Sequence, residues 1–200
     1  MKRFSSPERL ALAGTFVIMV LQAWPAAHGV LEYRADVVWD EPWRLLTAHL
    51  VHINWTHAAV NGAAWLVVAR LFAPDLNALD QAVVLVAGAL AVAIGLAQLY
   101  PVIEWYRGFS GALHALFFAG ASAWLARAAC PVQRHRWRTW LPLAVLVAGW
   151  IKVAFEQPGS DAVRYVQWLG ANVVPQAHLL GAIAGTVYGV WRVRRVPVPQ

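Results

Sequence analysis

A serine between two glycines opens one of the apolar stretches of this 200-residue chain, and a histidine lies near the start of the last one. The serine is Ser110, in the run Gly108-Phe-Ser-Gly111, and the histidine is His178. A serine hydroxyl becomes a nucleophile when a neutral imidazole removes its proton, so this pair is suited to acyl-enzyme chemistry. The flanking Gly108 and Gly111 allow a sharp turn and a close approach of substrate. With no obvious acidic residue at the same depth, we expect a Ser–His dyad in preference to a triad.

Two more polar residues, His57 and Asn61, could bind the oxyanion that such chemistry creates. They are four residues apart and therefore share one face of a helix. A donor of this kind is typically worth about 3–4 kcal/mol, and the N-terminus of the helix that Ser110 opens would add backbone amides. Each residue also has a simpler interpretation: Ser110 as a helix cap, His178 as a packing residue, and His57 with Asn61 as partners of nearby backbone. Their convergence on one depth favours a site.

The composition indicates a membrane protein. Hydrophobic residues make up 60% of the chain and charged residues only 13%, whereas a soluble domain has roughly a quarter charged residues. A bilayer-spanning helix needs about 20 largely apolar residues, and six segments approach this: 9–30, 56–73, 82–101, 110–129, 139–155 and 173–191. We therefore predict an all-α integral membrane protein, with residues 1–200 forming one domain. A count of five or seven would require reassigning a whole segment.

The basic residues set the expected orientation. With the N-terminus inside, most of them lie on the cytoplasmic side, namely Lys2, Arg3, Arg9, Arg70, Arg127, Arg134, Arg136, Arg138, Arg192, Arg194 and Arg195. The others are Arg34, Arg44, Arg107, Lys152 and Arg164. The positive-inside rule then places both termini in the cytoplasm. The net charge of +6 does not indicate nucleic-acid binding, because these residues cluster at segment ends, where they contact lipid headgroups.

In this orientation the polar residues named above lie just below the outer surface. Ionisable groups inside a membrane are costly and are functional candidates by default. The longest polar segment, 31–55, is rich in Trp and Tyr, so we expect a first outer loop partly embedded at the interface. We expect no metal and no cofactor. His49, His52 and His57 are closely spaced, but no carboxylate accompanies them at membrane depth, and zinc sites usually have three or four converging ligands.

Small residues explain how the last apolar segment would approach the fourth. Gly181, Gly185 and Gly189 recur at every fourth position after His178, and residues 110–129 carry Gly111, Ala115 and Ala119 at the same spacing. Such stripes let two helix backbones pack closely. If these two segments are partners, the packing brings His178 to Ser110.

Together these motifs resemble the rhomboid intramembrane serine proteases. The family's serine motif reads Gly108-Phe-Ser-Gly111, its sixth-helix motif Ala177-His-Leu-Leu-Gly-Ala-Ile-Ala-Gly185, and its second-helix motif His52-Ile-Asn-Trp-Thr-His-Ala-Ala-Val-Asn61. The resemblance implies a six-helix rhomboid core, with Ser110 as nucleophile and His178 as general base. It also implies that His57, Asn61 and the Ser110 amide form the oxyanion hole. By the same resemblance His52 supports the start of the second helix, and Trp43-Arg44 fixes the embedded loop. His49 has no counterpart, and we expect interfacial solvation for it.

A departure from the usual rhomboid pattern indicates a subfamily. Many rhomboids carry a tyrosine four residues after the serine, where this chain has His114, which could stack on His178 or compete with it as a base. His114, the segment Leu45–His57 and the run Lys152-Val-Ala-Phe-Glu-Gln157 are similar to the rhombosortases. That similarity implies a bacterial inner-membrane enzyme whose active site opens to the periplasm. Its substrates would be membrane-anchored proteins with a C-terminal Gly-Gly, apolar-helix and basic tail, cleaved by hydrolysis or with transfer to a lipid amine. Whether the enzyme requires an accessory membrane subunit stays open.

Lys152 and Glu156 allow two interpretations. They share one helix face, and such a pair stabilises a helix or anchors it at the membrane interface. The alternative is substrate recognition or organisation of a loop. Two rivals to the overall assignment also remain: a generic rhomboid protease acting on other transmembrane substrates, and a catalytically inactive rhomboid-like binder of membrane proteins. Labelling of Ser110 by a fluorophosphonate separates an enzyme from a binder.

Overall fold

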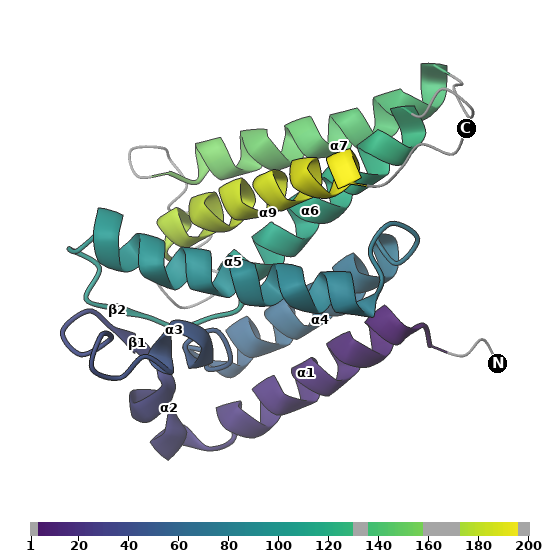
Figure 1. The fold of residues 1–200 in the computed structure, drawn as a ribbon. Helices are drawn as coiled ribbons and strands as arrows, with labels where there is room; N and C mark the ends of the chain where they lie inside the picture. Colours follow the sequence, from purple (N-terminus) through teal and green to yellow (C-terminus); the bar gives the residue numbers. More distant parts are fainter. Residues whose placement is uncertain (1–3, 130–135, 158–172, 196–200) are drawn as a thin grey trace.

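The structure is a computed structural model that describes residues 4–129, 136–157 and 173–195. Within these ranges the chain is mainly helical, with two short strands (Figure 1). In chain order the elements are α1 (Ser6–Gln22), α2 (Pro25–Leu31), β1 (Tyr33–Arg34), α3 (Arg44–Thr47), α4 (Trp55–Leu71), α5 (Ala78–Leu99), β2 (Trp105–Tyr106), α6 (Ser110–Ala129), α7 (Arg136–Phe155) and α9 (Pro175–Arg195).

The first apolar segment is not the single helix expected over residues 9–30. It forms α1 and α2, which are bent by 106° relative to each other. Proline restricts the residue before it to extended conformations and cannot donate a backbone hydrogen bond. Trp24, which precedes Pro25, accordingly has φ −118° and ψ 79°. The chain therefore turns after Gln22, and α2 runs along one end of the molecule.

The remaining expected segments coincide with helices, with small shifts at their ends. The helix α6 covers the predicted range, residues 110–129. Asn77 starts α5 earlier than expected, because its side chain accepts from the Asp80 amide and the Asp80 side chain accepts from the Asn77 amide, a capping box. The helix α4 begins close to its expected start at residue 56. Asn54 caps it, because the Asn54 side chain accepts from the His57 amide.

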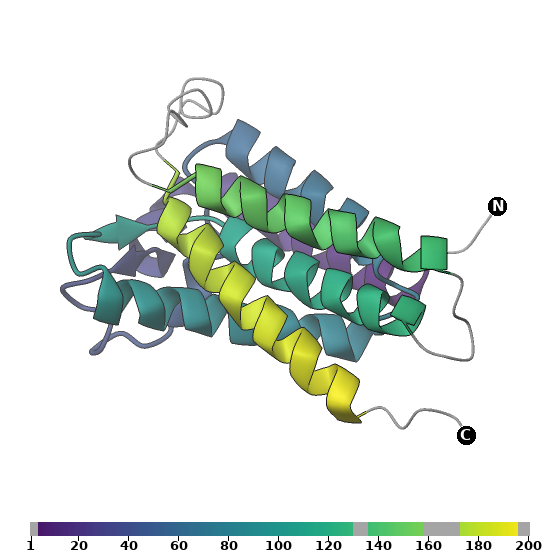
Figure 2. The same cartoon turned by 90° about the horizontal axis from the view of Figure 1, so that it is seen from above.

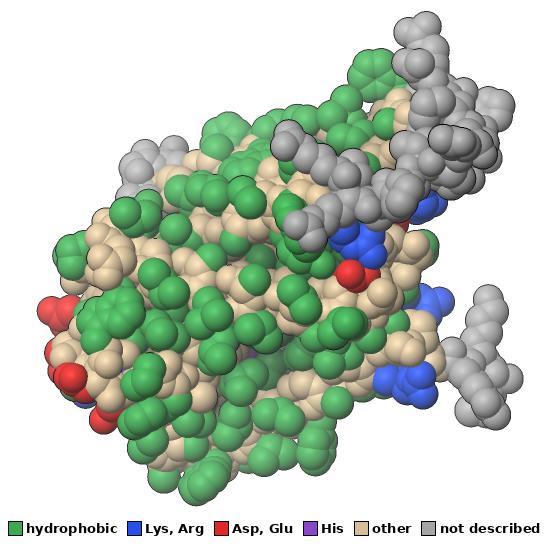
Figure 3. All heavy atoms as spheres, in the orientation of Figure 1, with side chains coloured by type: hydrophobic (Ala, Val, Ile, Leu, Met, Phe, Trp, Pro, Cys, Tyr) green, Lys and Arg blue, Asp and Glu red, His purple; other side chains and the backbone are tan. Residues whose placement is uncertain are grey.

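Two described helices, α5 and α6, are long and apolar enough to cross a bilayer, and the bent pair α1–α2 would make a third if it counts as one span. The apolar part of α7, Thr139–Phe155, is shorter. The count of six spans therefore stays a prediction. The surface is nevertheless that of a membrane protein: hydrophobic side chains cover much of the face in Figure 3, and large ones such as Phe16 and Leu79 are strongly exposed. Soluble proteins rarely expose apolar surface of this extent.

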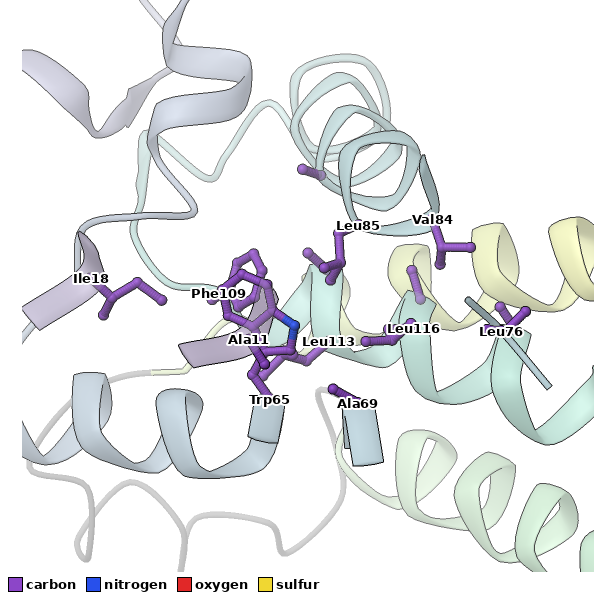
Figure 4. Packing of buried hydrophobic residues seen from close by; sticks show 14 of the residues in the cluster. Ala11, Ile18, Trp65, Ala69, Leu76, Val84, Leu85, Phe109, Leu113 and Leu116 are labelled. Atoms are coloured by element: carbon purple, nitrogen blue, oxygen red, sulfur yellow. The ribbon is translucent and has the colours of Figure 1, made fainter. Parts of the chain in front are cut away.

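The helix that begins with Ser110 lies at the centre of the fold. It packs against α4, α5, α7 and α9, and α9 crosses it obliquely (Figure 2). Its buried face joins a cluster of apolar side chains from α1, α4 and α5, which includes Ala11, Trp65, Val84, Leu85, Phe109, Leu113 and Leu116 (Figure 4). The central position of α6 fixes Ser110 relative to every helix that carries a candidate site residue.

The segment between α2 and α4, which the sequence predicted as the first outer loop, is fastened by the Trp-Arg pair noted in the sequence. The buried guanidinium of Arg44 donates to the carbonyl oxygens of Gly29 and Glu32, at 2.8 and 2.7 Å. The indole of Trp43 donates to the carbonyl of Val30 at 3.1 Å. These bonds tie α3 to the C-terminal end of α2. The loop is also paired to the segment before α6, because β1 and β2 are antiparallel with Tyr33 opposite Tyr106.

Candidate active site

The backbone before α6 adopts a conformation that only glycine accommodates easily. Gly108 has φ +128°, and a Cβ atom there would lie 2.6 Å from Cε1 of His57. The Gly108 amide donates to the carbonyl of Ala48 at 3.0 Å, and its carbonyl accepts from the Tyr106 hydroxyl at 2.6 Å. The turn is therefore held from both sides, and it places Ser110 as the first residue of α6.

The structure brings Ser110 and His178 together. Nε2 of His178, in the first turns of α9, lies 3.0 Å from the Ser110 hydroxyl oxygen. The close approach of the two helices depends on glycines. A Cβ atom on Gly181 would overlap the carbonyl of Gly111, and one on Gly185 would overlap the carbonyl of Ala115. The partner of the glycine stripe is therefore the helix of Ser110, as the sequence suggested.

The expectation that no acidic residue lies at the depth of His178, on which the preference for a dyad rested, is wrong. Oε2 of Glu156 lies 2.9 Å from Nδ1 of His178, and both side chains are largely buried. Glu156 follows directly after the end of α7, and His178 lies only one turn from the start of α9 at Pro175. The two residues therefore meet at one level. Sequence counting missed the pair because it placed His178 deeper in its helix than the structure does.

Glu156 is held as a carboxylate. Burial would raise its pKa, but hydrogen bonds with His178 and Lys152 outweigh burial and lower the pKa to about 2. Lys152 Nζ lies 2.8 Å from Oε1 of Glu156, so the expected Lys152–Glu156 pair on one helix face is present. This pair lies against the histidine that faces Ser110, so its contacts are not confined to α7.

His114 adopts the stacked arrangement that the sequence allowed. Its ring lies nearly parallel to that of His178, with centroids 4.1 Å apart and an interplanar angle of 16°. Its Nδ1 donates to the carbonyl of Ser110 at 2.7 Å. Its Nε2 accepts from Lys152 Nζ at 3.1 Å. The position of His114 against the carbonyl of Ser110 makes it a poor base for the Ser110 hydroxyl.

His57 and Asn61 lie on α4 with unused donors. Both are buried, and among the described residues neither ring nitrogen of His57 nor Nδ2 of Asn61 has a hydrogen-bond partner. Buried polar atoms without partners are rare and costly. Both side chains line the same pocket as Ser110 and His178. A negatively charged oxygen beside Ser110 would satisfy these donors.

The two other histidines of the second-helix region are buried and hydrogen-bonded to the backbone. Nε2 of His52 accepts from the Phe109 amide at 3.4 Å. Its ring lies edge-on to His57, with centroids 5.0 Å apart. His49 is fully buried, and its Nε2 donates to the carbonyl of Ala89 at 3.0 Å. The expectation of interfacial solvation for His49 is therefore wrong. Burial lowers the pKa of His49 to about 4 and that of His52 to about 3, so both are neutral at pH 7.

Pockets of two kinds reach Ser110 in the part of the chain that the structure describes. A largely apolar pocket of about 390 Å³ is lined by α4, α6, α7 and α9, with Val60, Phe117 and Gly149 among its walls. A second pocket, of about 260 Å³, reaches Ser110 and His57 from the segment around β2 and contains Glu104 and Arg107. The first suits an apolar peptide segment, and the second suits water or a small polar reactant.

One group of described residues comes near a metal-binding arrangement. Ligand-type atoms of His114, Glu156 and His178 lie within 4.8 Å of one another. The carboxylate and ring nitrogens already bond to each other, to Lys152 and to Ser110. The two rings are also stacked, so their nitrogen lone pairs do not converge on one point. Hydrogen bonding accounts for this group, and His49, His52 and His57 do not form such a cluster.

Comparison with protein families identifies the class. The Rhomboid domain model matches residues 40–195, which is most of the chain and includes every candidate site residue discussed above. The chain belongs to the rhomboid family, whose members are generally intramembrane serine proteases. A search of curated proteins finds no match.

Proposed function

We propose that this protein is an intramembrane serine endopeptidase in which Ser110 is the nucleophile and His178 the general base. The single observation that carries the proposal is the 3.0 Å approach of His178 Nε2 to the Ser110 hydroxyl in a chain of the rhomboid family. Family membership alone would also fit an inactive relative. The presence of nucleophile, base and unpartnered buried donors in one pocket favours an active enzyme.

The geometry supports a two-step reaction. Ser110 Oγ attacks the peptide carbonyl carbon while its proton moves to Nε2 of His178. The resulting oxyanion accepts hydrogen bonds from the Ser110 amide, His57 and Asn61. The imidazolium then gives its proton to the departing amine nitrogen, and an acyl-enzyme ester remains on Ser110. Water or an amine releases the acyl group by the same path in reverse.

The apolar pocket supports a transmembrane substrate. Residues of α4 and α7 line it together with Ser110 and His178. A helical segment in the lipid could deliver an unwound, extended stretch to Ser110 through it. His57, His114 and His178 surround the serine, and this crowding favours substrate residues without side chains. It supports the Gly-Gly tail that the rhombosortase resemblance implies.

The charge distribution supports the proposed orientation. In Figure 3 the basic side chains gather at the end of the molecule where α1 begins and α9 ends, and acidic side chains gather at the opposite end. The positive-inside rule would place the first end in the cytoplasm. The exposed Trp39, Trp43 and Trp105 at the acidic end suit an interfacial loop at the outer, periplasmic face of a bacterial inner membrane. Lys2, Arg3, Arg134 and Arg164 lie outside the described residues.

The test uses purified protein in liposomes with a substrate carrying a Gly-Gly, apolar-helix and basic tail. We expect cleavage near the Gly-Gly, and mass spectrometry of the new C-terminus reports whether water or an amine accepted the acyl group. Cleavage of other transmembrane segments but not of this tail would favour a generic rhomboid protease. Binding without cleavage of any substrate would contradict the proposal and favour an inactive binder.

A further inference from the structure

Five hydrogen bonds form a closed ring that begins and ends at Ser110. The Ser110 hydroxyl bonds to His178 Nε2, His178 Nδ1 to Glu156, and Glu156 to Lys152. Lys152 bonds to His114 Nε2, and His114 Nδ1 returns to the Ser110 carbonyl. The ring joins α6, α7 and α9, so three helices must be in place for it to form.

The chemistry of the groups allows only one distribution of protons around this ring. A carbonyl oxygen only accepts and an ammonium only donates. Nδ1 of His114 must therefore carry the proton that bonds to the Ser110 carbonyl, and Nε2 of His114 must accept from Lys152. Oε2 of the Glu156 carboxylate accepts from Nδ1–H of His178 and from Lys152, which also contacts Oε1. Nε2 of His178 is left with its lone pair directed at the Ser110 hydroxyl.

We propose that Glu156 is a positioning residue that completes a Ser110–His178–Glu156 triad, and that Lys152 and His114 hold the Glu156 carboxylate and the His178 ring in the working arrangement. This inference rests on the proposed serine-protease function. When the Ser110 proton moves to Nε2, the proton on Nδ1 stays in place and Glu156 remains a carboxylate. The negative charge then stabilises the imidazolium until its proton reaches the leaving amine.

The two charged residues act on that imidazolium in opposite directions. The carboxylate of Glu156 favours it, and the ammonium of Lys152 opposes it. Among the described residues, the other titratable groups that face His178 are His114 on α6 and His57 on α4. Both histidines are retained in the variants below, although Lys152→Met also removes the donor to Nε2 of His114.

The decisive variant is Glu156→Gln, measured as kcat and KM on a cleavable substrate across pH. Lys152 Nζ contacts both oxygens of Glu156, so either orientation of the Gln amide leaves His178 without a neighbouring negative charge. The orientation that turns the NH2 group toward Nδ1 would also move the ring proton to Nε2, the wrong tautomer. We expect kcat to fall by about 100-fold or more with little change in KM. The acid limb of the pH profile should move to lower pH, and Glu156→Asp should recover part of the rate.

Lys152→Met should have the opposite effect on the pH profile, because it leaves the Glu156–His178 contact in place but removes the positive charge. Its acid limb should move to higher pH. Asp40→Asn, an exposed acidic residue on the same outer side, is the matched control and should leave the pH profile unchanged. Should Glu156→Gln fail to fold, Lys152→Met and Glu156→Asp carry the test.

The result that overturns the inference is an active wild-type enzyme whose Glu156→Gln variant keeps the wild-type kcat and pH profile. Acid limbs that move in the same direction in Glu156→Gln and Lys152→Met would also overturn it. Failure of the proposed function itself looks different. In that case the wild-type protein would neither cleave substrate nor react with a fluorophosphonate.

Discussion

A Cβ atom on Gly185 would overlap the backbone carbonyl of Ala115, so α9 and α6 lie in direct backbone contact at this point. Backbone cannot move aside as a flexible side chain can. The separation of the two helices, and with it the contact between His178 and Ser110, therefore requires the absence of a side chain at Gly185, as it does at Gly181.

We predict that Gly185→Val inactivates the protein although residue 185 touches neither the hydroxyl nor the imidazole. Valine would push α9 away from α6, and a displacement of about 1 Å at a catalytic pair can cost on the order of a hundredfold in rate. The melting temperature should fall as well. Cleavage rates and melting temperatures of the purified variant in detergent provide the measurement.

Gly189→Val is the matched comparison, and it should be milder. A Cβ atom at Gly189 would meet Cβ of Ser122 at 2.5 Å and the carbonyl of Ala119 at 3.2 Å. The closest atom belongs to a side chain, and the site is one turn farther from His178. Equal and full activity in both variants would show that close approach on this face does not hold the catalytic pair together.

Gly108→Ala should reduce activity by tenfold or more. The positive φ of Gly108 is costly for alanine, by about 1–3 kcal/mol, and its methyl group would press on the ring of His57. Gly29→Ala is the control, because a Cβ atom on Gly29 meets nothing within 4 Å. The two variants are compared by turnover per folded molecule, and equal turnover would count against a strained turn at Gly108.

For His57→Ala and Asn61→Ala we expect graded losses, with chemistry remaining in each. Removing one oxyanion donor typically lowers kcat by about 10²–10³, and the Ser110 amide and the other side chain would still bind the oxyanion. KM should change little, because these donors act mainly on the transition state. If either variant were expressed at a lower level but kept a normal kcat in its folded fraction, that residue would be assigned to packing.

The sequence was informative where few structural roles explain the presence of a residue type. Glycines at every fourth position predicted the contact between α6 and α9, because only a close backbone approach requires them. The polar residues Ser110, His178, His57 and Asn61 were predicted to meet because each is costly in an apolar segment, and the structure lines one pocket with all four.

The sequence was misleading where depth along a helix decided the outcome. Counting from the estimated segment ends put Glu156 at the surface and His178 deeper in the membrane. An error of a few residues in either end is enough to place the two groups at different depths, although they are 2.9 Å apart in the structure. His49 was assigned to the interface because it matched no motif. Its burial depends on α5, whose Ala89 carbonyl accepts its hydrogen bond from 40 residues away in sequence.

Ser110→Ala and His178→Ala should each abolish proteolysis while the fold is retained. The two residues act as one unit, so the double variant should be no worse than either single variant. Melting temperatures report the fold, and the cleavage assay reports the chemistry. A double variant much slower than both single variants would indicate that the residues contribute independently, against a shared proton transfer.

The most direct measurement of the central claim is reaction of the wild-type protein with a fluorophosphonate, followed by mass spectrometry of the labelled peptide. A base-activated serine reacts at its hydroxyl, whereas an ordinary helix-capping serine does not. We predict one adduct on Ser110, absent in Ser110→Ala and strongly reduced in His178→Ala. A folded wild-type protein without any adduct, or a Ser110→Ala variant that still cleaves substrate, would contradict the assignment of Ser110 as the nucleophile.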